Sequence, residues 1–95
     1  MIELALSRQA QIDLREIADY IARDNPDRAE SFIEELLAKM DAICEHPTGY
    51  RIRTECRPNL RSSTHRGYHI IFRVSAGRVD IARVMHGSRD IPNLL

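Results

Sequence analysis

The sequence is poor in the residues that mark several protein classes. It contains no tryptophan, three tyrosines, two phenylalanines, four glycines and four prolines. The rest of the composition is ordinary, with 43% hydrophobic and 29% charged residues, which excludes a disordered or collagen-like chain. A length of 95 residues supports one domain, so we expect residues 1–95 to form a single folded unit.

Features of membrane and secreted proteins are also missing from the sequence. No apolar run approaches the roughly 18 residues that a membrane-spanning helix needs. Residues 1–4 lack the basic and apolar stretches of a secretory signal. Cys44 and Cys56 match no metal-binding spacing, and we expect both to be reduced thiols without a role. These absences predict a cytoplasmic protein with no metal, no cofactor and no membrane partner.

Net charge is zero, but the charges are unevenly divided along the chain. Residues 1–50 carry 5 basic and 11 acidic side chains, a net charge of −6. Residues 51–95 carry 9 arginines and 3 acidic side chains, a net charge of +6. This asymmetry predicts an acidic partner for the second half. The alternative is that these arginines pair with the acidic helices of the same chain.

The first half of the chain predicts one strand and two helices. Apolar and other residues alternate over residues 2–7, as in a short strand, and Ser7 is placed to cap a helix over about residues 8–24. Asn25 and Pro26 separate this helix from a second one, which His46 and Pro47 end. A break this short makes the helices antiparallel neighbours. The first helix has its apolar stripe at Leu14, Ile17, Ala18 and Ile21 and its charges opposite, at Asp13, Arg15, Glu16, Asp19 and Arg23.

The second half predicts strands. A polar strand is expected at residues 60–66, a half-buried strand at 68–75 and another at 79–86, with a tight turn at Ala76 and Gly77. Strict alternation places Arg83 on the side of Ile81, so we expect either a bulge or a partly open face near Arg83. The fold class is therefore α+β, with the order β-α-α-β-β-β and a helical hairpin packed on one face of a small antiparallel sheet.

Several segments resemble the ParE toxins of the ParE/RelE superfamily. The run Asp-Leu-Arg-Glu-Ile at residues 13–17 and the break at 24–26 resemble their first helix and its end. Residues 57–61 and 68–74 resemble their central sheet. Residues 81–90, with the pattern Ile-x-Arg-Val-x-His-x-x-Arg-Asp, resemble their closing strand and tail. The similarity extends in order over essentially the whole chain, and it implies the same helical-hairpin-plus-sheet fold.

The resemblance implies a toxin of a bacterial type II toxin–antitoxin system. A ParD-like antitoxin would wrap a flexible, acidic and amphipathic segment around it and form a hetero-oligomer. ParE-type members act on DNA gyrase, whereas RelE-type members cut mRNA in the ribosome, so the site must decide between two functions of one fold. We expect a growth-inhibiting protein that binds gyrase without catalytic residues of its own. The alternative is a ribosome-dependent mRNA interferase.

A ribonuclease must deprotonate a 2′-hydroxyl, stabilise a crowded phosphate and protonate the leaving oxygen. RelE-like enzymes use several Lys and Arg residues and a C-terminal Tyr. Here the only lysine is Lys39, in the second helix, and residues 87–95 contain no tyrosine. The alternative catalytic set is Arg61, Arg83 and His86. A second design in the superfamily resembles microbial ribonucleases, and Glu55, either Arg61 or Arg66, and His86 could imitate it. The few aromatic rings argue against stacking of RNA bases and against direct sequence-specific nucleic-acid binding.

The candidate partner-binding residues lie in the basic half of the chain. Their competing interpretation is structural, for instance ion pairs of Arg83 with Asp80 and of Arg89 with Asp90, or a hydrogen-bonded histidine at the end of a strand. Exposed pairs of this kind stabilise a fold by only about 0–1 kcal/mol, so stability alone hardly explains so many arginines. The predicted surface for the antitoxin or for gyrase consists of Arg61, Arg66, Arg73, Arg83, His86 and Arg89.

Overall fold

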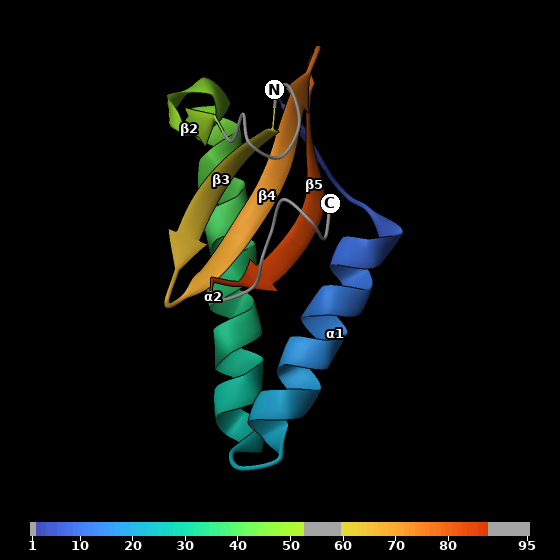
Figure 1. Cartoon of the computed structure of the whole chain (residues 1–95), viewed down its shortest axis with the longest axis vertical. Helices are drawn as coiled ribbons and strands as arrows, with labels where there is room; N and C mark the ends of the chain where they lie inside the picture. The colour runs from blue at the N-terminus through green and yellow to red at the C-terminus, as the bar shows by residue number, and fades with distance from the viewer. Residues whose placement is uncertain (1, 53–59, 88–95) are drawn as a thin grey trace.

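Figure 1 shows the computed structural model of the chain, which describes residues 2–52 and 60–87. Two helices form a hairpin beside a twisted sheet; in this view the second helix lies behind the strands and the first lies to one side of them. The elements are β1 (Glu3–Leu6), α1 (Arg8–Ala22), α2 (Pro26–Glu45), a short 3₁₀ turn η1 (Pro47–Gly49), β2 (Arg51–Ile52), β3 (Leu60–His65), β4 (Tyr68–Ser75) and β5 (Arg78–His86).

The strand order in the sheet is β1-β5-β4-β3-β2. The α+β class and the helical hairpin packed on a sheet are confirmed. The sheet is mixed, however, because β1 pairs with β5 in parallel while the other pairings are antiparallel. An alternating pattern predicts a strand but says nothing of its neighbour, and here β1 pairs with the strand farthest from it along the chain. β2 has only two residues, too few for an alternating pattern, and was not predicted.

Capping by polar side chains sets where both helices begin. The Ser7 hydroxyl accepts a hydrogen bond from the Ala10 N–H at 3.0 Å, as its position predicts. Asn25 Oδ1 accepts one from the Arg28 N–H at 3.1 Å, and Pro26 occupies the first turn of α2, where its missing N–H costs nothing. The short connection between these caps makes the helices antiparallel neighbours.

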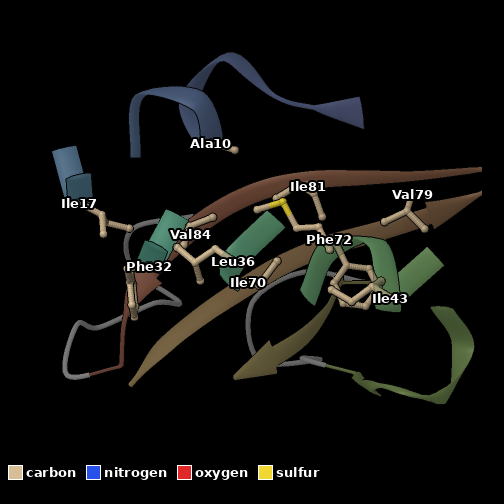
Figure 2. Packing of buried hydrophobic residues seen from close by; sticks show 11 residues of the cluster. Ala10, Ile17, Phe32, Leu36, Ile43, Ile70, Phe72, Val79, Ile81 and Val84 are labelled. Atoms are coloured by element: carbon tan, nitrogen blue, oxygen red, sulfur yellow. The ribbon is translucent and has the colours of Figure 1, made fainter. Parts of the chain in front are cut away.

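The core lies between the helical hairpin and the sheet (Figure 2). Phe72 and Ile81 from the strands and Leu36 from α2 are fully buried there. A second, smaller cluster of Leu60, Ile71 and Met85 comes from the alternate positions of β3, β4 and β5. The other buried members of the main cluster are Ala10, Ile17, Phe32, Met40, Ile43, Ile70, Val79 and Val84.

The expected bulge is present in β5. Ile71 pairs with Arg83 but the next residue, Phe72, pairs with Ile81, which leaves Ala82 as the extra residue. Ser7 holds this irregularity, since its N–H donates to the Ile81 carbonyl at 2.9 Å and its hydroxyl donates to the Ala82 carbonyl at 2.7 Å. The residue that caps α1 therefore also ties the start of the helix to the bulge.

Beyond Ile81, α1 takes over from β1 at the edge of β5. The last β1 residue to pair is Leu6, opposite Ile81. Two residues past the bulge, the Val84 N–H donates to Asp13 Oδ2 at 2.9 Å, and Arg83 donates to the same carboxylate from Nε (2.8 Å) and Nη2 (3.1 Å). Asp13 is only 5% exposed, so its expected place on the solvent side of α1 was wrong. The Asp13 carboxylate thus accepts a hydrogen bond from a main-chain N–H of β5 that a neighbouring strand would otherwise accept.

We predict that Asp13→Ala strongly destabilises the fold. The substitution leaves the Val84 N–H and the Arg83 guanidinium without their acceptor in a buried place, which costs about 3–5 kcal/mol of unfolding free energy. Asp80→Ala is the matched control, because it breaks the exposed Arg78–Asp80 ion pair and should cost only about 0–1 kcal/mol. Urea unfolding of the two variants measures both values. Equal losses would show that the buried carboxylate is not what joins α1 to β5.

Candidate functional site

A cleft of about 680 Å³ lies between α1 and the last residues of β5. The second half of α1 forms one wall, β5 forms the floor, and Tyr68 of β4 adds a ring beside it. The position of the cleft follows from the end of β1, because α1 runs along β5 only where no strand pairs with it. The lining residues from α1 and its C-cap are Asp13, Glu16, Ile17, Asp19, Tyr20 and Arg23, and those from β5 are Arg83, Val84, Met85 and His86.

Arg83 lies in this cleft but is already paired. The hydrogen bonds to Asp13 raise its pKa, partial burial opposes the shift, and the negative charges of Asp13 and then Glu16 add to the increase. The guanidinium therefore stays charged and is neutralised by a carboxylate of its own chain. The expected alternative of an Arg83–Asp80 pair is not formed, since Asp80 pairs with Arg78 at 2.9 Å.

His86 ends β5 at the mouth of the cleft. Its ring meets the Tyr68 ring edge to face, with the centroids 5.2 Å apart and the planes at 89°. Arg83 and His86 thus line one cleft, as the ribonuclease alternative requires. The third member of that set does not. The Arg61 guanidinium donates to the Thr48 and Tyr50 carbonyls at 3.2 and 2.8 Å, beside η1 and β2.

Arg66 lies in the tight turn between β3 and β4, with a positive φ of 47°. Its Nε donates to Glu35 of α2 at 3.2 Å, and the same carboxylate lies 2.7 Å from His65 Nε2 and accepts from Arg28 at 2.5 Å. The Arg28 hydrogen bond, followed by that of His65, lowers the pKa of Glu35 to about 2. The Arg66 side chain remains 64% exposed, so this cluster orients it without covering it.

The remaining candidates are spread over the basic half of the chain. Arg73 is exposed on β4, in register with Leu60 on one side and Asp80 on the other. Arg89 and Glu55 lie outside the residues that the structure describes. The structure therefore brings two of the six candidates, Arg83 and His86, into one cleft and places Arg61, Arg66 and Arg73 elsewhere.

The acidic wall of the cleft was missed by the sequence analysis, which treated Glu16 and Asp19 as a solvated helix face. The sequence did contain one signal, since Tyr20 is an aromatic residue outside the apolar stripe of the first helix. In the structure its side chain is 67% exposed. Within residues 2–52 and 60–87, no group of three or more His, Cys, Asp and Glu side chains is placed to hold a metal ion. Neither α1 nor α2 combines the length and apolar character that crossing a membrane requires.

Comparison with known proteins gives consistent matches over nearly the whole chain. Residues 4–91 match the family described as the ParE toxin of the type II toxin–antitoxin system parDE. Toxin ParE1 of Caulobacter vibrioides is 38% identical over 87 residues, which are 87% of this chain and 86% of that protein. A solved structure of a chromosomal ParDE system from P. aeruginosa matches with a TM-score of 0.78 over 90% of this chain and 96% of the other, and at 22% identity it supports the fold.

We predict that the Glu35 cluster makes stability depend on pH below about 4.5. The pKa of Glu35 is lower in the folded protein than its ordinary 4.5, so the unfolded chain binds more protons between pH 4.5 and 2 and stability falls as pH falls through that window. Glu35→Gln should remove this part of the acid sensitivity. Urea unfolding at both ends of the window measures it, with Glu34→Gln, an exposed neighbour on α2, as control. The same pH dependence in both variants would contradict the assignment.

Proposed function

The chain belongs to the family of ParE toxins of type II toxin–antitoxin systems, and from this we propose that it arrests growth by binding and inhibiting DNA gyrase. In this proposal it acts in the cytoplasm as a binding protein without catalytic residues, and a ParD-like antitoxin neutralises it in a hetero-oligomer. The toxin identity rests on the family match over residues 4–91. The choice of gyrase as the target rests on the resemblance to ParE toxins, whose members act on gyrase.

The observation that most supports a binding mode of action is the engagement of Arg83. A ribonuclease needs a free cation at the phosphate, where negative charge grows in the transition state. The Arg83 guanidinium instead donates two hydrogen bonds to the buried Asp13 carboxylate, and breaking that pair would loosen α1 from β5. Its commitment to the fold is better explained by a structural role than by catalysis.

The mRNA interferase alternative has one observation in its favour, the shared cleft of Arg83 and His86. The same cleft carries the Glu16 and Asp19 carboxylates, which repel the phosphates of RNA. Arg61 does not line it, because its guanidinium is bound to two main-chain carbonyls beside η1. The arrangement therefore argues against RNA cleavage in this cleft.

The basic half of the chain offers the antitoxin a surface of matching charge. Arg73 on β4 is exposed, and Arg66 reaches out of the β3–β4 turn. Guanidinium groups bind carboxylates with two parallel hydrogen bonds, so exposed arginines suit an acidic antitoxin segment. Arg73 follows Phe72, which is buried in the core against the helices, so alternation along β4 places Arg73 on the opposite face of the sheet. Arg66 is 64% exposed in the β3–β4 turn, although its Nε donates to Glu35 of α2.

We predict that the purified toxin inhibits gyrase-catalysed supercoiling of plasmid DNA or traps cleaved DNA, and that added antitoxin reverses the effect. Primer extension on translating mRNA should show no codon-positioned cuts. The His86→Ala variant separates the two functions, because it should abolish the cuts if the interferase alternative is correct. Unimpaired gyrase at saturating toxin would overturn the proposed target.

We predict that Arg66→Ala combined with Arg73→Glu weakens antitoxin binding by about tenfold or more, because both changes remove positive charge that faces an acidic segment. Arg8→Ala combined with Arg15→Glu makes the same charge change on exposed positions of α1 and serves as the matched control. Calorimetric titration with the cognate ParD-like antitoxin measures both affinities. Equal losses in the two variants would place the antitoxin surface elsewhere.

A further inference from the structure

The antitoxin surface proposed above, Arg66 and Arg73, does not include the cleft between α1 and β5. The α1 wall of this cleft carries an exposed aromatic ring. Tyr20 is 67% exposed, compared with 37% for Ile12 and 40% for Leu37, the other large hydrophobic side chains described as exposed. A ring left open to solvent in a cleft provides a large, rigid contact surface at low entropic cost. The exposed Tyr20 ring is therefore better placed to contact a binding partner than to pack in the core of its own chain.

Two carboxylates lie beside this ring on the same wall. Glu16 and Asp19 precede Tyr20 by one turn and by one residue, and all three line the cleft. Within the described part of the chain, neither carboxylate accepts a hydrogen bond or forms an ion pair, although the charge of Glu16 is felt by Arg83. The Asp13 carboxylate in the same cleft already accepts hydrogen bonds from Arg83, Val84 and Gln9. The charges beside Tyr20 are therefore the Glu16 and Asp19 carboxylates toward the start of α1 and Arg23, the C-cap residue, toward its end.

An aromatic face next to carboxylates is the setting that a guanidinium or ammonium group prefers. The cation is attracted to the ring within about 6 Å of its centre and forms charge-assisted hydrogen bonds to the carboxylates. We propose that the α1–β5 cleft receives an arginine or lysine side chain from a segment of the antitoxin, bound between Tyr20 and the Glu16 and Asp19 carboxylates. The proposal rests on the proposed function, because it assumes that an antitoxin binds this chain.

The antitoxin is the occupant that the observations favour. Nucleic acid is repelled by Glu16 and Asp19. The antitoxin is the partner that the toxin–antitoxin family implies. The proposed function also places an antitoxin segment on the exposed arginines of the sheet. A segment that bridges both surfaces must carry acidic residues for Arg66 and Arg73 and a basic residue for the cleft. A basic surface and a site with two carboxylates on one protein together bind only a segment that carries acidic and basic residues in the matching order. This arrangement makes binding specific to one partner.

The test compares two double variants that remove the same charge. Glu16→Gln with Asp19→Asn changes the cleft, whereas Glu30→Gln with Glu34→Gln changes exposed positions of α2. Antitoxin affinity, dissociation rate and salt dependence are measured by surface plasmon resonance, with thermal unfolding to confirm that both variants fold. We expect the cleft variant to bind about tenfold or more weakly and with a smaller salt dependence, and the control to bind within about twofold of the original chain.

Tyr20 supplies an independent reading of the same site. Tyr20→Ala should weaken binding, and Tyr20→Phe should retain most of it because the ring face is kept. Binding that is unchanged in the cleft variant and in Tyr20→Ala would overturn the inference while leaving the antitoxin partnership intact. Wild-type toxin that does not bind the antitoxin at all would overturn both. Cleft variants that lose only gyrase inhibition, or only self-association, would assign the cleft to another occupant and also overturn the inference.

Discussion

The hydrogen bonds to the Asp13 carboxylate are the interaction on which the rest of the structure depends. β1 covers β5 only as far as Ile81, and a β5 edge beyond it would leave main-chain groups without partners. Asp13 accepts from the Val84 N–H and from Arg83, so α1 replaces the missing strand. Ser7 secures the same junction by capping α1 and bonding to the bulge in β5. The placement of the helical hairpin against the sheet follows from these contacts.

This junction also determines what the cleft offers a ligand. Arg83 is used to hold α1, so among the described lining residues the groups left to a ligand are the Glu16 and Asp19 carboxylates, the aromatic rings and Arg23. A phosphate-binding chemistry is disfavoured there, and a cationic side chain is accommodated. A single ion pair thus stabilises the fold and argues against the catalytic alternative, which connects the stability of the protein with its proposed mode of action.

The uneven division of charge along the chain takes on a spatial meaning in the fold. The acidic first half forms the two helices, and part of the basic second half is neutralised by them, Arg83 through Asp13 and Arg66 through Glu35. Both interpretations of the arginines therefore apply, to different residues: Arg83 is structural, whereas Arg73 remains exposed. What remains accessible is a basic region on the sheet side and an acidic cleft beside α1. A partner that covers both regions must carry charges of both signs.

The amino-acid sequence by itself determined the elements, because caps, breaks and periodicity are local: Ser7, Asn25 and Pro26 set the helices, and the parity of Ile81 and Arg83 predicted the bulge. The family was also evident from the order of its motifs. Tertiary structure alone decided the parallel pairing of β1 with β5, the burial of Asp13 and the cleft with Glu16 and Tyr20. These depend on contacts between residues about 70 positions apart in the chain, such as Asp13 with Arg83 and Val84, and no local pattern contains them.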